Sequence, residues 1–201
     1  MTNAVLLTSL TNRVPLASPR ALRLTAVLFL TALTAAAAQV SFPLPFTPVP
    51  LTLQPMVVLL GGAALGSRLG ASSQMLYLLA GIAGMPIFAA SPVLPQGLAR
   101  LAGPTGGFLL SYPLAAFVTG WLAERGCDRR YLTSVLAMAA GLTIIFASGV
   151  SMLAMQLTPA LGVGAWNASM QAGFYPFALV DAVKVLLAAA VLPGVWKVVG
   201  R

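Results

Sequence analysis

The sequence contains no histidine, a single cysteine (Cys127) and three acidic residues among its 201 residues. One cysteine cannot form an intrachain disulfide. With one thiol, no imidazole and three carboxylates, a transition-metal site made by the protein is not expected. Catalysis by a nucleophile with a base lacks a histidine, and a two-carboxylate site within the membrane is not possible, because Glu124 and Asp128 are expected in a cytosolic loop. We therefore expect neither an enzyme nor a resident cofactor.

Charge of either sign is also scarce, at 7% of residues, whereas 59% are hydrophobic. A soluble domain carries about 25% charged residues, and the mean hydropathy here is +0.96. The composition predicts an integral membrane protein. The net charge is +8, but only Arg129 and Arg130 are adjacent. No basic run is interleaved with aromatic residues, so nucleic acid is not an expected partner.

Long uncharged stretches define the predicted fold, an all-α bundle of six transmembrane helices with both termini in the cytosol. Leu24 to Ser67 carries no charge, which is enough for two spans of about 20 residues. Five prolines between 43 and 55 divide this stretch. We expect a cytosolic tail over 1–23 and a transmembrane domain over 24–201. Its helices are predicted at about 24–40, 51–67, 71–89, 105–123, 132–157 and 173–198.

The basic residues indicate how this bundle is oriented in the membrane. Positively charged residues concentrate in cytosolic loops. Nine of the eleven basic residues fall on the side of the two termini: Arg13, Arg20, Arg23, Arg68, Arg125, Arg129, Arg130, Lys197 and Arg201. That side is therefore predicted to be cytosolic, and the protein a multi-pass protein of the plasma (inner) membrane.

The first predicted helix contains the alanine-rich tract TALTAAAAQV. The tract could be a signal-peptide cleavage site, or small residues that pack inside the bundle. A third interpretation is docking on another membrane protein, because small residues let helix backbones approach closely. Ala32 and Ala36, four residues apart, would form that face.

The last predicted helix carries Asp181 and Lys184, which share one helix face because they are three residues apart. Ionisable groups in hydrocarbon are costly and usually mark a substrate or ion path. The pair could be a structural ion pair. It could instead contact a polar ligand that both donates and accepts hydrogen bonds. Asp181 is about 8 residues into the helix, or ~12 Å, which predicts a site in the outer half of the bilayer.

Arg100 is the basic residue that falls on the predicted outer side, in the Gly/Pro-rich loop ASPVLPQGLARLAGPTGG. It is either a stray surface charge or a contact for an anionic group of a ligand. The outer loops 41–50, 90–104 and 158–172 could cover a site that is open to the outside.

Four motifs in order resemble BioY, the family of biotin-binding S-components of energy-coupling factor (ECF) transporters. They are TPVPLTLQ (47–54), LLGGAALGSRLGASSQMLYLLAGIAGMPIF (59–88), GPTGGF (103–108) and PFALVDAVKVLLAA (176–189). The resemblance covers about 25–201. Two features depart from the family pattern. Phe108 replaces the family's tyrosine, and the loop before GPTGG, which is Gly-rich in the family, contains prolines and Arg100 here.

The resemblance implies capture of biotin from outside and its delivery to the cytoplasm. Asp181 and Lys184 match the family's ligand-contacting pair, and Arg100 is our hypothesis for the valerate carboxylate. Thr52 and Gln54 are expected to contact the ligand, or to form hydrogen bonds at a helix end. Gly106 and Gly107 are expected to allow a tight turn and close approach, or to offer N–H groups to an anion.

The resemblance also implies partners. S-components dock through a small-residue face of their first helix, here Ala32 and Ala36, onto a transmembrane coupling subunit that carries ATPase subunits. The sequence has no GxxxxGK[ST] motif, so ATP would be used by those partners. Two alternatives remain: an S-component for a different vitamin, and a structural membrane protein with an internal Asp–Lys ion pair.

Overall fold

The computed structural model describes residues 18–91 and 94–199. Apart from one antiparallel pair of two-residue strands, its regular structure is helical. The elements in chain order are α2 (Pro19–Gln39), β1 (Ser41–Phe42), β2 (Leu51–Thr52), α3 (Gln54–Leu65), α4 (Ser67–Ile82), α5 (Leu98–Ala102), α6 (Gly106–Leu110), α7 (Tyr112–Ala123), α8 (Tyr131–Leu161), a 3-10 turn (Gly162–Gly164), α9 (Ala165–Gly173) and α10 (Tyr175–Val199).

Four of the described helical segments are long and apolar enough to cross a membrane: α2, α6 with α7, α8 with α9, and α10. Helix α3 is apolar but shorter. At 12 residues it measures about 18 Å, less than the ~30 Å of a bilayer's hydrocarbon core. Helix α8 has 31 residues, so at about 46 Å it extends beyond that thickness.

Local chemistry explains where the first helices begin and end. Helix α2 begins at Pro19, earlier than the start near 24 that the sequence predicted. Ser18 caps it, since its hydroxyl accepts a hydrogen bond from the amide of Ala21 at 3.2 Å. Helices α3 and α4 meet at Gly66, whose φ of 89° is open to glycine. The Glu124 carboxylate then accepts bonds from the amide and hydroxyl of Ser67, both at 2.8 Å, at the positive end of α4.

The helix predicted over 105–123 is two helices, with a break at Ser111. The cause is Pro113, which has no N–H to donate to the carbonyl of Leu109. The ladder resumes where the amide of Ala115 donates to the Ser111 carbonyl at 2.8 Å. The break leaves α6 as a short separate helix beside the segment 98–105.

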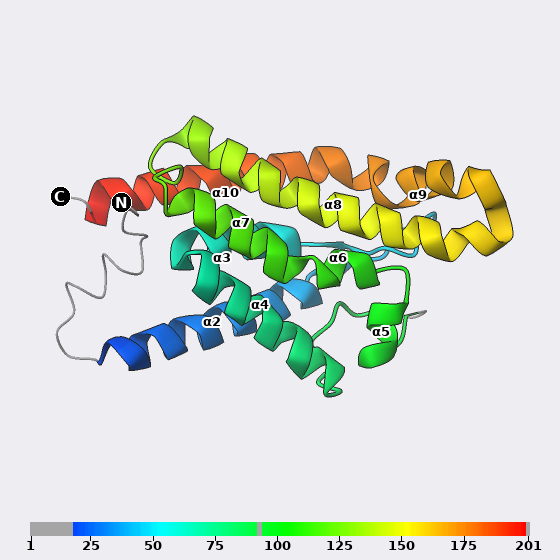
Figure 1. Cartoon of the computed structure of the whole chain (residues 1–201), viewed down its shortest axis with the longest axis horizontal. Coiled ribbons are helices and arrows are strands. Elements are labelled where there is room, and N and C mark those ends of the chain that lie inside the picture. The colour runs from blue at the N-terminus through cyan, green and yellow to red at the C-terminus, as the bar shows by residue number, and fades with distance from the viewer. Residues whose placement is uncertain (1–17, 92–93, 200–201) are drawn as a thin grey trace.

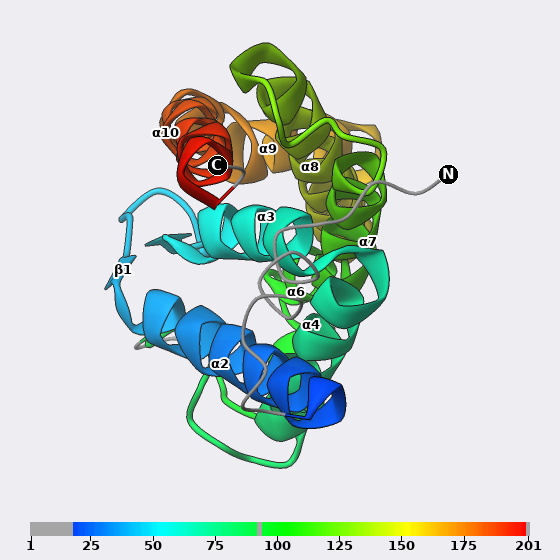
Figure 2. The ribbon, with the colours of Figure 1, turned by 90° about the vertical axis from the view of Figure 1, so that its left-hand side faces the viewer.

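The helices are arranged around α3, α4 and α7, which pack on one another (Figure 1). Helices α8 and α10 lie on one side of this group, and α2 lies on the other. Seen along the bundle, α3 lies between α2 and α10 (Figure 2). The core is fully buried and mixes aliphatic and aromatic side chains, including Leu59, Tyr77, Met138 and Ile145.

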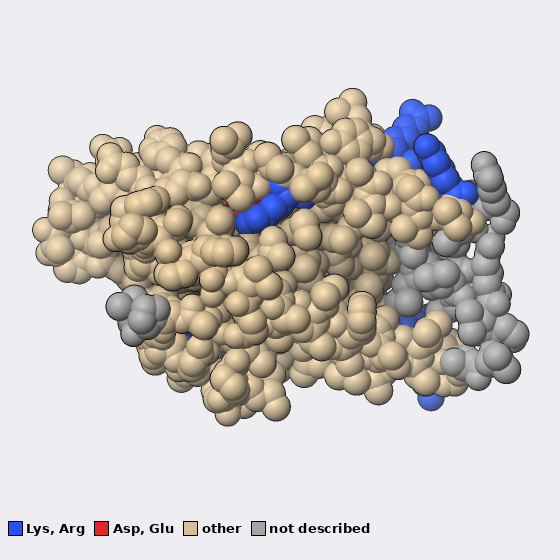
Figure 3. Space-filling view, turned by 180° about the vertical axis from the view of Figure 1, so that it is seen from behind, with Lys and Arg blue, Asp and Glu red and all other residues tan. Residues whose placement is uncertain are grey.

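Basic side chains gather at one end of the bundle. Figure 3 shows the blue residues concentrated at that end of the visible face, and one further blue strip beside a little red in a hollow midway along it. The start of α2, the loop after α7 and the end of α10 all lie at the basic end (Figure 1). Arg13 and Arg201 are outside the described residues. The opposite end is formed by the segments 40–53, 83–91, 94–105 and 158–174.

Candidate functional site

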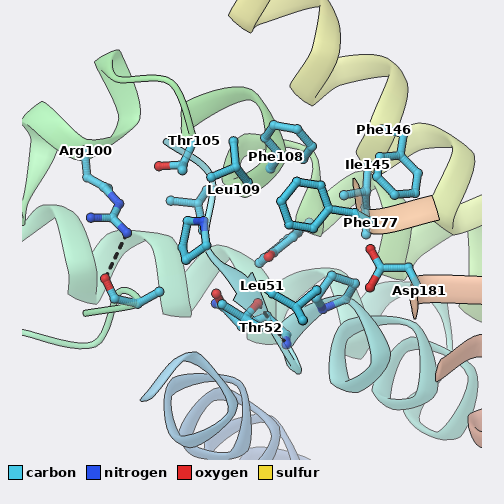
Figure 4. Close-up of a pocket in the computed structure, with 16 residues that line it drawn as sticks. Leu51, Thr52, Arg100, Thr105, Phe108, Leu109, Ile145, Phe146, Phe177 and Asp181 are labelled. Carbon is cyan, nitrogen blue, oxygen red and sulfur yellow. Dashed lines mark hydrogen bonds between the residues drawn. The ribbon is translucent and has the colours of Figure 1, made fainter. Parts of the chain in front are cut away.

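A cavity lies in the half of the bundle that holds α5, α6 and the start of α10, away from the basic end (Figure 1). Figure 4 shows the residues that line it. Its walls come from the β1–β2 connection and the start of α3, from α5, from α6 and the start of α7, from the middle of α8, and from the start of α10. Residues far apart in the sequence therefore meet here because these parts of the helices converge. The free volume is about 50 Å³, so only a few waters fit without movement of side chains.

Asp181 and Lys184 form a buried ion pair at one end of this cavity. The Lys184 ammonium donates to Asp181 Oδ1 at 2.7 Å and to the carbonyl of Thr52 at 2.6 Å. Asp181 lines the cavity, and Lys184 does not. A lysine has three N–H donors, so this arrangement uses two and leaves one. The cavity thus meets one carboxylate, with the ammonium held directly behind it.

Thr52 and Gln54, both predicted contacts, line the cavity where strand β2 leads into α3. The Thr52 hydroxyl accepts a hydrogen bond from the backbone N–H of Gln54 at 3.3 Å. The Gln54 side-chain nitrogen donates to the Tyr77 hydroxyl at 2.7 Å, and that hydroxyl donates to the Ile87 carbonyl at 3.1 Å. Because Tyr77 has one proton to give, Gln54 must meet it with its NH₂ group. The Gln54 amide oxygen is therefore the end left for other donors.

Arg100 lines the cavity from α5 and is 1% exposed. Its guanidinium donates to the carbonyl of Ala89 at 2.8 Å and to that of Leu94 at 3.3 Å. Its Nε has no partner among the described residues, and no carboxylate of the described chain pairs with it. Burial lowers the pKa of Arg100 from its usual value, but a guanidinium stays charged in proteins. Arg100 is a buried cation and not a stray surface charge.

Gly106 and Gly107 do not line the cavity. A Cβ on Gly106 would overlap the carbonyl of Leu101, and a Cβ on Gly107 would lie 2.5 Å from the carbonyl oxygen of Ser148 on α8. Neither glycine has a positive φ. Both glycines thus allow α6 to approach its neighbours closely. Their contact with a ligand remains a prediction.

The middle of the cavity is apolar, and sequence reasoning did not identify its residues. Figure 4 shows Phe108, Leu109 and Phe177 between Arg100 and Thr105 on one side and Asp181 on the other. Phe108 and Thr105 belong to the GPTGGF motif, and Phe177 is the Phe of the Pro-Phe before Asp181. These motifs were therefore the available signal, although single motifs do not say which side chains face inward.

Phe146 of α8 separates this cavity from a second, apolar groove. It lines both, and the groove between α8, α9 and the start of α10 has a volume of about 520 Å³. The ring of Phe146 packs edge-on against Phe174, with centroids 5.0 Å apart. Two aromatic rings thus form the wall between the cavity and the outer surface of α8 and α10.

This arrangement defines a class of protein: a multi-pass helical membrane protein with a small cavity at one end, apolar between polar ends. A crystal structure described as the S-component for biotin from an ECF-type ABC transporter has the same fold. The two match with a TM-score of 0.75 at 22% identity, over 89% of this chain and 92% of that one.

The family model named BioY family matches residues 8–201. The probable biotin transporter BioY of Pyrococcus horikoshii is 37% identical over 160 residues, 80% of this chain and 87% of that protein. The biotin transporter BioY of Thermotoga maritima is 36% identical over 161 residues, 80% and 88% of the two chains. The chain belongs to the BioY family. It is accordingly a multi-pass protein of the cell membrane and a transport-family protein rather than an enzyme.

Proposed function

We propose that this protein is the biotin-binding S-component of an ECF-type transporter. It captures biotin from outside the cell in the cavity between Arg100 and Asp181 and delivers it to the cytoplasm. The family membership and the transporter names of its relatives support this assignment. The Asp–Lys pair, which the resemblance links to the ligand, lies at that cavity.

The observation that carries the proposal is the division of the cavity into two polar ends with an apolar middle (Figure 4). Biotin has a ureido ring with two N–H donors and one carbonyl, an aliphatic chain, and a terminal carboxylate. The Asp181 carboxylate accepts from ureido N–H groups. The remaining Lys184 N–H, which does not face the closed cavity, donates to the ureido carbonyl once the cavity opens. Arg100 holds the carboxylate at the other end, and Phe108 and Phe177 enclose the chain between them.

Binding also requires the cavity to open. Pockets for small ligands commonly measure about 300–1,000 Å³, whereas this one has about 50 Å³. The segment 41–52 covers part of it, where Pro50, Leu51 and Thr52 form a wall. Thr47 in that segment donates to the carbonyl of Ala172 in α9 at 2.6 Å. We propose that biotin enters when this segment moves outward.

In the membrane, the bundle is proposed to have six spans, with both termini and the basic end in the cytosol. Helices α3 and α4, joined by the tight turn at Gly66, are then short spans that do not reach across the full hydrocarbon core. The cavity lies in the outer half of the bilayer. This orientation follows the positive-inside rule, since the described arginines and Lys197, apart from Arg100, lie at the end of the bundle where α2 begins and α10 ends.

Release of biotin inside is proposed to use an ATP-driven ECF module. The exposed side of α2 carries Ala32 and Ala36 and would dock on the transmembrane coupling subunit, which carries the ATPase subunits. In this arrangement the chain supplies the binding site, and its partners supply the energy.

Titration of the purified full chain in detergent with biotin tests the proposal, with thiamine and riboflavin as controls. We expect calorimetry to show tight one-to-one binding of biotin and no heat from the other two vitamins. Binding of another vitamin alone would make the chain an S-component for that ligand. If a folded sample binds none of them, Asp181–Lys184 is a structural ion pair, as its bond to the Thr52 carbonyl would also permit.

A further inference from the structure

The hydroxyl of Thr105 is an exception among the buried threonines of the described chain. Thr34 and Thr119 each donate to the carbonyl four residues earlier, and Thr52 accepts from a backbone amide. Thr105 is 5% exposed, yet its hydroxyl has no partner among the described residues. It also precedes α6 at the capping position without making a capping bond. Buried hydroxyls are normally paired, because an unmade bond is costly.

This hydroxyl lies at the cavity, on the same side as Arg100 (Figure 4). Arg100 Nε is likewise without a partner among the described residues. The cavity end opposite Asp181 therefore presents two unsatisfied donors, one of them on a cation. A carboxylate, which accepts several hydrogen bonds and carries the opposite charge, fits both groups.

The chain between the two residues is a compact turn that fixes their relative positions. The amide of Gly103 donates to the Arg100 carbonyl at 3.2 Å, and the amide of Gly106 donates to the Gly103 carbonyl at 2.9 Å. From α8, Gln156 donates to the Ala102 and Gly103 carbonyls at 2.8 and 2.9 Å. The turn thus fixes the backbone of Thr105 on the same side of the cavity as Arg100 before any ligand arrives.

We propose that Thr105 is a specificity-determining residue, whose hydroxyl donates a hydrogen bond to the ligand's carboxylate beside the charge of Arg100. This rests on the proposed function, because it assigns one end of the biotin site. Thr105 distinguishes a free carboxylate from a neutral carboxyl derivative, since a hydrogen bond to an ionised acceptor is stronger than one to a neutral acceptor. Without ligand the Thr105 hydroxyl makes no hydrogen bond with the described residues, which lowers the stability of the fold. The hydroxyl is therefore free to bond to the ligand.

The test compares biotin with biotin amide on the purified full chain by calorimetry. Thr105→Val keeps the side-chain shape and removes the hydroxyl, and Thr105→Ser keeps the hydroxyl. We expect Thr105→Val to weaken biotin binding by about tenfold or more and amide binding by clearly less. Thr105→Ser should stay close to wild type. Thr119→Val, a buried threonine away from the cavity, should leave the ratio of the two affinities unchanged.

Thermal unfolding without ligand separates this role from a structural one. Thr105→Val should unfold at the wild-type temperature or above, because it removes an unpaired buried hydroxyl. Thr119→Val, which loses a made bond, should unfold lower. Equal losses for biotin and its amide in Thr105→Val, or wild-type affinity for both, would overturn the proposal. Failure of the wild type to bind biotin at all would instead refute the proposed function.

Discussion

Each of the three carboxylates of this chain has a partner from another part of the structure. Glu124 holds the start of α4 through Ser67. Asp128 accepts a bond from the indole N–H of Trp196 at 2.6 Å, which joins the loop after α7 to the end of α10. Asp181 pairs with Lys184 at the cavity. Of the three, Asp181 alone lines the cavity. Its replacement is therefore the one that should change ligand affinity.

Replacing Asp181 by asparagine should weaken biotin binding by about 2 kcal/mol or more, roughly 30-fold in Kd. The substitution replaces a charged acceptor by a neutral amide and leaves the Lys184 ammonium buried without a counter-charge, beside the Thr52 carbonyl. Calorimetry on folded protein measures the loss. Lys197→Gln, which removes an exposed charge at the basic end, is the control and should bind as wild type. Wild-type affinity in Asp181→Asn would contradict the assigned site.

Asp128 makes folding stability depend on pH. Burial raises the pKa of its carboxyl above the ordinary value of 3.8, despite the opposing bond from Trp196 and the charge of Arg129. The folded protein therefore holds this proton more tightly than the unfolded chain does. By linkage, Asp128 lowers stability above the raised pKa, and this penalty disappears as the pH falls towards 3.8.

Thermal unfolding of wild type and Asp128→Asn at about pH 7 and about pH 4 isolates this effect. Asparagine still accepts the Trp196 bond but does not ionise, so the variant should lack the part of the pH dependence that Asp128 contributes. Its stability should match or exceed the wild type at the higher pH. The same change with pH in both proteins would show that Asp128 is not the responsible group.

At the scale of helices, the sequence predicted which stretches are helical better than where they stop. The uncharged stretches do contain α3, α8 and most of α2, whereas α10 lies largely beyond them. The observed helix ends differ from the predicted ones where glycine or proline ends a helix inside an apolar stretch. Helix α4 ends at Ile82 because Gly84, with φ of 94°, and Pro86 follow it. The predicted 71–89 instead followed the apolar composition, which continues through the turn.

The contact between α6 and α8 makes a prediction for Gly107. In Gly107→Ala the new Cβ would meet the Ser148 carbonyl oxygen at 2.5 Å and the Met152 Cβ at 2.7 Å. Backbone must then shift, which displaces α6 and the adjoining cavity wall. We expect a lower unfolding temperature and weaker biotin binding, measured by thermal unfolding and calorimetry.

Gly194→Ala is the matched control for this contact. Gly194 lies inside α10, and a Cβ there meets nothing within 4 Å. Alanine favours helix over glycine by about 0.8–1.0 kcal/mol, so this variant should be more stable and bind normally. If both alanine variants behaved alike, close packing of Gly107 would not be what the glycine provides.

For the molecule as a whole, the sequence singled out Thr52, Gln54, Arg100 and Asp181, which line the cavity, but not its apolar walls or Thr105. Asp181 and Arg100 stand out because charge is rare in an apolar chain. The structure brings both to one cavity, although 81 positions separate them in the sequence. Phe108, Phe146 and Phe177 could not be distinguished from other apolar residues, since facing inward depends on how five segments pack. Thr105 was missed because its unpaired hydroxyl is a property of the folded state.

Docking of the whole molecule on a transporter module should depend on the outer face of α2. Ala32 and Ala36 are exposed there, and the neighbouring Leu28 and Phe29 are 50% and 66% exposed. In Ala32→Leu or Ala36→Leu the larger side chain would keep a partner helix from approaching. Biotin binding should be unchanged, because α2 contributes no cavity wall.

Co-purification with an ECF coupling subunit and its ATPases measures the docking. Loss of the partners from Ala32→Leu or Ala36→Leu, with biotin affinity intact, is the expected result. Ala190→Leu, at an exposed alanine on α10, is the matched control and should retain the partners. Replacing an exposed alanine by leucine adds the same apolar groups to the surface of either helix. Only a specific interface on α2 would therefore make the variants differ. Equal recovery of the partners from all three variants would place the docking surface elsewhere on the bundle.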